Sequence, residues 1–452
     1  MSNLKVGYSR VNANPPLGYE IAGYYVKRYA KGYLDDITVG TLLLQYGDTN
    51  IAMISVDVCG LNEDFGIDVS SMIEKETNIP KENVYLTATH THTGPVVIND
   101  PTRYGVNEKL TTYIQFLKQR IVDSVVLALA DVKDAKMGYI YGYAPERVAY
   151  IRRYMMKDGT TFTCPPIDDP NIDYALGTLD QRVNVLRFDR KDAPTVVAVN
   201  YGVHADTING ELISADFPSV MAKTLEKALD GVKCIFFNGA EGDVGSTNVH
   251  PTKGDMNDTE ISFDNEMKSP GMARFVGRAL AGTVLQVYDK VHYVDVDEIK
   301  IVSKYIDIPS NMPTPEEMPL ARLYKQLHEE GKDDQIPFKA MQLTTAVADA
   351  VRKCRLENGP EFFTIRLTAV KIGPVVYLGI PGEPFTDIGV EIKKAEGWNL
   401  IMPTALTNGN IGYFPMKSAY DEGGYEAKTS NFKAGVAEII IENAIQLLNE
   451  LR

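Results

Sequence analysis

Residues 84 to 95 read VYLTATHTHTGP, an apolar and β-branched run that leads into two histidines separated by a single threonine. The first part of this stretch is typical of a buried strand. In an extended backbone, residues i and i+2 project to the same face, about 7 Å apart at Cα. We therefore expect His90 and His92 to point into one space, an arrangement that suits metal binding or shared catalysis. The plainer alternative is a pair of structural histidines at a strand end.

Strand and helix patterns alternate on both sides of this stretch. Further strand candidates are apolar and β-branched: 41–47, 51–58, 195–202, 234–237, 363–373 and 374–380, the last two joined by a turn at Gly373-Pro374. Helix candidates repeat apolar residues at three- and four-residue spacing: 111–132, 217–230, 272–291 and 431–451. The alternation predicts an α/β fold with a large mixed sheet. Residues 309–360 are Pro-rich and then charged, so we expect a helical insertion there, within a single catalytic domain spanning 1–452.

Length and charge exclude several classes of protein. The chain has 452 residues, with 46 basic and 60 acidic side chains and a net charge of −14. This charge repels phosphate backbones, so we expect no nucleic-acid partner. The apolar stretches are broken by charges before about 20 residues, so no transmembrane segment is expected. The N-terminus lacks the apolar run of a secretory signal, which predicts a cytoplasmic protein. Four cysteines without a CxxC pair indicate neither a disulfide framework nor a thiolate zinc site.

Other strand ends carry candidate metal ligands. His204 ends the apolar run 196–204, and Glu383 follows Pro381-Gly382, which stops another strand. Imidazole and carboxylate are common zinc ligands, and a hydrolytic zinc site needs about three or four protein ligands with one position open. The alternatives are a structural histidine and a carboxylate that complements a helix dipole. A glycine-rich turn at 238–246 adds four polar side chains: Asn238, Glu241, Asp243 and Ser246.

Together these motifs resemble the neutral/alkaline non-lysosomal ceramidases, a family of zinc amidohydrolases. The resemblance is carried by THTHTGP at 89–95, His204, NGAEGD at 238–243, PGEP at 381–384 and NGNIGYFPMKSAYDEGGYE at 408–426. It implies that Zn²⁺ is held by His90, His204, Glu383 and Tyr413. It also implies that His92 faces the substrate carbonyl and that Arg152 lies across the pocket, with Arg153 as the alternative arginine. Zinc polarises an amide carbonyl, and His92 or Arg152 would stabilise the developing oxyanion.

The chain departs from the family pattern in two places. The family turn carries a serine where this chain has Gly245, so Ser246 is the nearby candidate for a catalytic hydroxyl. The family also has a C-terminal β-sandwich domain, whereas this chain ends with the helical segment 431–451, as a short form would. We therefore expect no serine nucleophile, and a substrate amide that is smaller or more polar than ceramide.

The resulting hypothesis is a zinc-dependent hydrolase that cleaves a C–N amide bond in an N-acyl amide or N-acylsphingosine type of substrate, a small amide or lipid-like molecule. One alternative is a metal-dependent ester or phosphoester hydrolase, with a second metal held by carboxylates such as Asp57, Asp206, Asp216 and Asp243. Another is a non-catalytic metal-bearing protein that binds a lipid or a peptide. The oligomeric state does not follow from the sequence.

Overall fold

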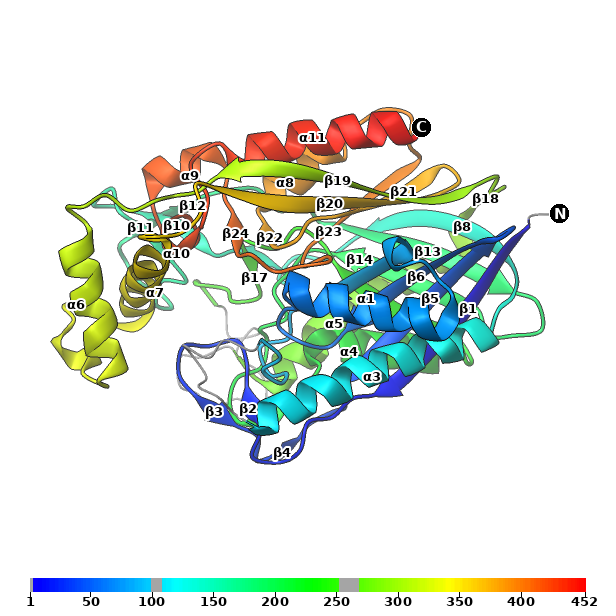
Figure 1. Ribbon diagram of the computed structural model, residues 1–452, viewed down its shortest axis with the longest axis horizontal. Coiled ribbons are helices and arrows are strands. Elements are labelled where there is room, and N and C mark those ends of the chain that lie inside the picture. Colours follow the sequence, from blue (N-terminus) through cyan, green and yellow to red (C-terminus); the bar gives the residue numbers. More distant parts are fainter. Residues whose placement is uncertain (1–2, 99–107, 252–267) are drawn as a thin grey trace.

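Two β-sheets that face each other form the centre of the molecule (Figure 1), and the computed structural model describes residues 3–98, 108–251 and 268–452. Side chains from both sheets share one buried cluster, in which Leu42 and Phe188 of the larger sheet meet Val370 and Tyr377 of the smaller one. Helices cover the outer faces of both sheets. The predicted α/β fold with a large mixed sheet is therefore confirmed. That the chain forms a single domain stays a prediction.

The larger sheet has nine strands and mixes parallel with antiparallel pairs. Along the sheet the order is β16 (Lys233–Asn238), β14 (Val196–Tyr201), β13 (Arg182–Arg190), β8 (Lys133–Tyr143), β1 (Leu4–Asn12), β5 (Thr38–Tyr46), β6 (Thr49–Val56) and β7 (Val84–Ala88), with β18 (His292–Val294) beside β8. The pairs β14–β16 and β6–β7 are parallel, and the other pairs are antiparallel.

The larger sheet curls until strands from its two ends meet. The Ser55 hydroxyl on β6 donates to the carbonyl of Phe236 on β16 at 2.6 Å, although five strands lie between β6 and β16 in the sheet order. The Tyr8 hydroxyl on β1 likewise donates to the carbonyl of Cys234 at 3.2 Å. Because twist accumulates along a sheet, such closure is a natural outcome of its right-handed coiling. The curl brings the carboxyl ends of β7 and β14 to the same place.

Helices α1 (Glu63–Thr77) and α3 (Glu108–Ala130) pack on the end of this sheet that contains β5 to β7. Helices α4 (Asp216–Ala228) and α5 (Pro270–Val287) pack on β13, β14 and β16. The buried positions of α3, such as Leu110, Ile114, Leu117 and Ile121, recur every three or four residues, as the sequence pattern predicted.

The smaller sheet has the order β19 (Ile299–Pro309), β20 (Phe362–Ile372), β21 (Val375–Gly379) and β23 (Leu400–Thr404). Its outer face is covered by α8 (Thr386–Ile392) and α11 (Val436–Leu451), and α11 is the long helix at the top of Figure 1. The expected helix at 431–451 is shorter, because Gly435 adopts φ +105 and Phe432 is buried in a β-bridge to Ser310.

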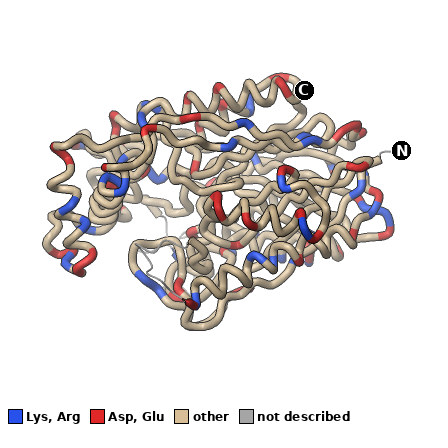
Figure 2. The backbone as a smooth tube through the Cα atoms, in the orientation of Figure 1, with Lys and Arg blue, Asp and Glu red and all other residues tan. Residues whose placement is uncertain are grey.

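The expected helical insertion is confirmed as α6 (Met318–Glu329) and α7 (Ala340–Leu356), which project together at the left of Figure 1. Acidic and basic residues are interspersed along this pair of helices (Figure 2), and Lys325 pairs with Glu329 at 2.9 Å. No helix within the three described ranges is long and apolar enough to span a membrane.

Shorter elements connect these parts. The short strands are β2 (Glu20–Ile21), β3 (Arg28–Tyr29), β4 (Gly32–Tyr33), β9 (Tyr150–Ile151), β10 (Arg153–Met156), β11 (Thr161–Thr163), β12 (Ile172–Ala175), β15 (Leu212–Ile213), β17 (Val244–Gly245), β22 (Glu383–Pro384) and β24 (Tyr413–Phe414). The short helices are α9 (Lys417–Glu422) and α10 (Tyr425–Thr429), with 3₁₀ turns at Lys81–Asn83, Tyr288–Lys290 and Asp333–Gln335.

Candidate metal centre

His90 lies just beyond β7, and its backbone departs from the extended conformation that the sequence argument assumed. The strand ends at Ala88, and His90 has φ +69, in the left-handed region that a non-glycine residue adopts at a cost. The expectation of an extended backbone is therefore wrong, although the two histidine rings do meet. The Nδ1 atom of His90 lies 2.6 Å from the carbonyl oxygen of Cys59. A carbonyl can only accept, so Nδ1 carries a proton and Nε2 is the nitrogen that could bind a metal.

His204 follows β14 and is oriented in the same manner. Its Nδ1 lies 2.8 Å from the carbonyl oxygen of Glu241 and 3.1 Å from that of Val244. These two acceptors fix the proton on Nδ1 and leave a lone pair on Nε2. Both histidines are buried, with 2% and 1% of their surfaces exposed. Each ring thus turns its Nε2 atom toward the interior of the site.

Glu383 completes a group of three donors. It forms β22, which pairs with β24 in a register that sets Glu383 beside Tyr413. Its Oε2 atom lies 3.3 Å from Nε2 of His90 and 3.2 Å from Nε2 of His204. The three donor atoms lie within 4.8 Å of one another. The structure therefore brings together three of the four ligands that the family resemblance implies.

The electrostatics of this group attract a positive charge. Burial lowers the pKa of His204 to about 4, so its ring is neutral at pH 7. Burial also lowers the pKa of His90, but the carboxylate of Glu383 outweighs it and raises that pKa well above the ordinary value. Burial raises the pKa of Glu383, yet His90 and His204 hold it well below its usual range. Two imidazole lone pairs and one carboxylate oxygen form an N₂O set that fits a zinc ion.

A second group, Cys59 with His90 and His92, also has donor atoms within 4.8 Å. The thiol of Cys59 lies 3.8 Å from Nδ1 of His90. That nitrogen is already bound to the carbonyl oxygen of Cys59, so it is not available as a ligand. The group of His90, His204 and Glu383 is the better metal centre.

His92 lies beside this centre and points at it. Its Nε2 is 3.3 Å from Nε2 of His90, and its Nδ1 is 3.7 Å from Oδ1 of Asp206. Burial lowers the pKa of His92 well below its ordinary value, against the opposing charge of Asp206. Asp206 also accepts hydrogen bonds from Tyr24 and Lys268. His92 is therefore held between the metal centre and a polar cluster.

Tyr413 lies beside Glu383, and Arg152 lies against Tyr413. The guanidinium carbon of Arg152 is 5.4 Å from the centre of the Tyr413 ring. Arg152 donates to Glu426 at 2.7 Å and to the carbonyl oxygen of Gly242 at 2.9 Å. Burial, and then the charge of Glu383, raises the pKa of Tyr413 well above its ordinary value, so the phenol stays neutral unless a cation is bound.

Arg153 points elsewhere, to Glu422 and Gly423, so Arg152 is the arginine that reaches the site. Glu426, which sequence reasoning did not single out, holds Arg152 from the last position of the motif at 408–426. Tyr425 was also missed, and its ring lies 5.6 Å from that of Tyr413. Both belong to the motif at 408–426, but nothing in the sequence shows which residues of this motif point into the protein.

The turn at 238–246 contacts the ring of His204 through the backbone carbonyl oxygens of Glu241 and Val244. Glu241 is fully buried, and neither oxygen of its carboxylate has a hydrogen-bond partner among the described residues. Burial raises the pKa of Glu241 well above its ordinary value. Asp243 instead accepts two hydrogen bonds from Thr386, at 2.8 and 2.9 Å.

Ser246 is 4% exposed, and no hydrogen bond or ion pair joins it to the three candidate ligands in the part of the chain that the structure describes. Gly245 pairs with Tyr150, and a Cβ atom placed on it would lie 3.9 Å from Arg152. A side chain at this position would therefore contact Arg152.

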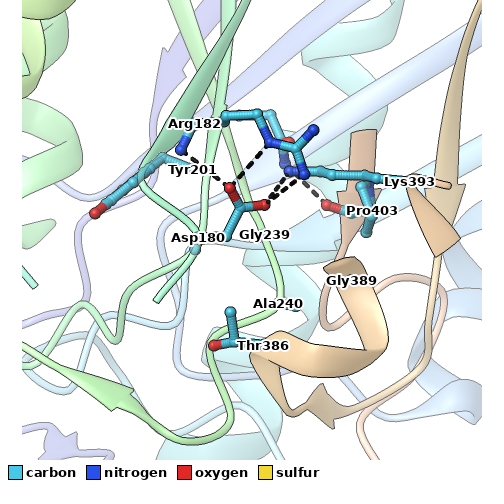
Figure 3. Close-up of a pocket in the computed structure, with 11 residues that line it drawn as sticks. Asp180, Arg182, Tyr201, Gly239, Ala240, Thr386, Gly389, Lys393 and Pro403 are labelled. Carbon is cyan, nitrogen blue, oxygen red and sulfur yellow. Dashed lines mark hydrogen bonds and ion pairs between the residues drawn. The ribbon is translucent and has the colours of Figure 1, made fainter. Parts of the chain in front are cut away.

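Two cavities lie close to this region. Figure 3 shows a small one of about 20 Å³ behind the turn, where Asp180 pairs with Arg182 and Lys393. It has room for about one water molecule, so it is not a substrate site. A larger cavity of about 760 Å³ lies between the helical insertion and α10, lined by residues that include Leu320, Tyr324, Phe338, Met341 and Tyr425.

The four aspartates proposed for a second metal are each engaged by other partners. Asp57 accepts from Thr38, and Asp216 accepts from Thr207 and Phe217. Asp206 and Asp243 are held as described above. Within the described ranges, none of the four belongs to a cluster of three or more potential ligands. This arrangement does not favour a two-metal site.

Comparison with known proteins identifies the fold. No protein-family model and no curated protein matches the chain. The whole chain matches the crystal structure of neutral ceramidase from Pseudomonas aeruginosa with a TM-score of 0.71 and 16% identity, and it covers 75% of that chain. It also matches a ceramidase complexed with C2, with a TM-score of 0.73, 14% identity and 76% coverage of that chain. The chain therefore has the fold of the neutral ceramidases, and the resemblance drawn from its motifs is confirmed at the level of fold.

Proposed function

We propose that this chain is a zinc-dependent hydrolase that cleaves a C–N amide bond in an N-acyl substrate. The observation that carries the proposal is the convergence of His90 Nε2, His204 Nε2 and Glu383 Oε2. Both imidazoles have their protons fixed on Nδ1 by carbonyl oxygens, as ligands oriented by second-sphere hydrogen bonds do. Tyr413, in register with Glu383, is the proposed fourth ligand.

When bound, zinc supplies Lewis acidity, which polarises a carbonyl and lowers the pKa of coordinated water toward 7. His92 points Nε2 at the same centre and is positioned to donate to a substrate carbonyl oxygen. Arg152 is fixed by Glu426 and by the carbonyl oxygen of Gly242, so its charge stays beside Tyr413. The buried surroundings of both groups strengthen their effect on a developing negative charge.

The substrate class rests on two lines of support. The matched structures are ceramidases, which suggests an N-acyl amide. Gly245 stands where that family carries a serine, so we propose attack by water rather than by a side-chain hydroxyl. A smaller or more polar amide than ceramide is the expected substrate. The cytoplasmic location also stays a proposal, which fractionation of the native cells would test.

The direct test is a screen of N-acyl amides, from acyl amino acids to ceramides, against zinc-loaded protein and a chelated control. Turnover that requires zinc and releases a free amine supports the proposal. Hydrolysis of esters or phosphoesters but of no amide would favour the alternative enzyme class. Absence of any turnover by fully loaded protein would favour a binding protein.

A further inference from the structure

Arg28, the first residue of β3, is a buried basic residue that the proposed chemistry does not use. Only 8% of its surface is exposed. A guanidinium in such a place usually pairs with a carboxylate, as Arg152 does with Glu426. Among the described residues Arg28 has no ion pair, and both of its terminal nitrogens donate to backbone carbonyl oxygens instead. This guanidinium therefore binds backbone rather than an acid.

The carbonyl oxygens that Arg28 binds belong to three separate segments of the chain. Its Nη2 atom lies 2.6 Å from the carbonyl oxygen of His92 and also donates to that of Ala22. Its Nη1 atom donates at 2.9 Å to the carbonyl oxygen of Gly210, in the loop that follows His204. One planar guanidinium thus ties the backbone of His92 to two other loops.

The segment that leads into β3 also packs against the side chain of His92. Gly23 has φ +105, and a Cβ atom placed on it would lie 2.7 Å from Cβ and Cγ of His92. The Tyr24 ring lies edge-on to the His92 ring, with their centres 5.6 Å apart. The guanidinium carbon of Arg28 in turn lies 4.1 Å from the centre of the Tyr24 ring. Arg28 therefore holds the residues that pack on His92 as well as its backbone.

The backbone of His92 has one other fixed point, because its N–H donates to the carbonyl oxygen of Ala205 at 2.9 Å. Arg28 fixes the carbonyl end of the same residue. The rings of the candidate ligands His90 and His204 are oriented by different carbonyl oxygens, to which Arg28 makes no contact among the described residues. Loss of the guanidinium should therefore move His92 and leave the ligands in place.

We propose that Arg28 is a positioning residue for the reaction, which fixes the backbone and, through Gly23 and Tyr24, the ring of His92 so that Nε2 points at the metal centre. The inference rests on the role of His92 in the proposed function. Lysine keeps the charge, but its ammonium is a compact donor on a flexible stem and lacks the planar fork that spans the three carbonyl oxygens. A misplacement of about 1 Å near the reacting atoms can cost about 100-fold in rate.

The kinetic test compares Arg28→Lys, His92→Ala and the double variant, each loaded with zinc, on the N-acyl amide that the screen identifies. Arg28→Lys should keep its zinc and its KM and lose about 10- to 100-fold in kcat. In the His92→Ala background the same change should cause no further loss, because the group that Arg28 positions is gone. An equal loss in both backgrounds, or a loss of zinc, overturns the inference.

The second readout needs no turnover. The chain has six histidines, so the NMR signals of the His90, His92 and His204 ring protons can be assigned by their loss in the corresponding alanine variants. In metal-free Arg28→Lys the His92 signal should shift most. An unchanged His92 signal, or equal shifts of all three, overturns the inference. If the wild-type protein cleaves no amide, the proposed function fails, whereas this comparison still decides whether Arg28 positions His92.

Arg190→Lys is the matched control. Arg190 is 7% exposed and donates to the carbonyl oxygens of Pro194 and Asp131 at 2.8 and 3.3 Å, at the last residue of β13. This variant should keep the wild-type kcat and the wild-type His92 signal. A loss of kcat equal to that of Arg28→Lys would show a general effect of buried arginines and contradict the inference.

Arg28→Gln is the second variant, because its side-chain amide can still donate to one carbonyl oxygen. It should give the same pattern as Arg28→Lys: zinc retained, kcat lowered and the His92 signal shifted most. If neither variant folds, the guanidinium supports the fold as a whole, and the inference that it acts on His92 is wrong.

Discussion

The backbone carbonyl oxygen of Glu241 lies 2.8 Å from Nδ1 of His204, so the glycine-rich turn and the end of β14 form one unit. This bond fixes the ring tautomer, because a carbonyl accepts and does not donate. It also directs Nε2 toward Glu383, 3.2 Å away. The turn at 238–246 therefore contributes to the centre through its backbone.

The first prediction concerns His204, the candidate ligand with the lowest exposure, 1%. Replacing it with alanine removes one of three convergent donors, so His204→Ala should lose most of its bound zinc. Metal analysis of purified protein measures this loss directly. His292→Ala is the control, because His292 is exposed on β18 and should retain full zinc. Full occupancy in His204→Ala would remove His204 from the ligand set.

The second prediction separates His92 from the ligands. His92 Nε2 faces the centre, but its other nitrogen faces Asp206, and the better metal group does not include it. His92→Ala should keep its zinc and lose about 100-fold or more in turnover, the scale of deleting one oxyanion donor. Zinc content and kcat are measured on the same preparation. Departure of zinc together with the ring would make His90 and His92 a chelating pair.

The sequence was sufficient to place the candidate ligands at strand ends. His90 follows β7, His204 follows β14 and Glu383 follows β21, each where an apolar run stops. Apolar runs mark buried strands well, because both faces of such a strand are covered. This is why β5, β6, β14, β16, β20 and β21 were all expected close to their observed positions.

Strands with one polar face were missed for the corresponding reason. In β8, Ala135 and Met137 are buried while Lys136 is exposed, and β1 and β19 also mix buried with exposed positions. Alternation of this kind leaves no continuous apolar run to recognise. The missed strands matter for the site, because β1, β8 and β13 span the sheet between β5 and β14.

The exact geometry of the centre depends on contacts between distant parts of the chain. The left-handed backbone of His90 and the carbonyl of Cys59 that fixes its ring have no local signature. The curl that brings β7 near β14 depends on tertiary bonds such as that from Ser55 to Phe236, 181 residues apart. A single sequence therefore indicates which residues are candidates but not how they are oriented.

The third prediction concerns the pH dependence of stability through Asp57. Burial raises the pKa of Asp57 from 3.8 to about 6, although Thr38 donates to it twice and opposes the shift. Well below pH 3.8 the carboxyl is protonated in both the folded and the unfolded chain, so its ionisation does not change the free energy of unfolding. As pH rises to 6, the unfolded chain ionises first, so the folded state loses stability, by roughly 3 kcal/mol for about two pKa units.

Asp57→Asn removes this ionisation. The free energy of unfolding of metal-free wild type should therefore fall relative to that of Asp57→Asn between pH 4 and 6, and the difference should stay constant above that range. Denaturant titrations of both proteins at several pH values measure the difference. A difference that does not change with pH would show that Asp57 ionises equally easily in the folded and the unfolded chain.

The last prediction is that no serine acts as a nucleophile. Ser246 is the nearby hydroxyl, but within the described ranges nothing joins it to the candidate ligands, so Ser246→Ala should change turnover by less than about tenfold, or roughly 1.4 kcal/mol in barrier. Gly245→Ser is the complementary variant. The backbone of Gly245 is not in the left-handed region, and its Cβ would make ordinary contacts with Arg152 at 3.9 Å, so the variant should fold with wild-type stability. A collapse of several orders of magnitude in Ser246→Ala with zinc retained, or ceramide as the best substrate, would mean that Ser246 fills the serine's role and that the protein acts as a ceramidase.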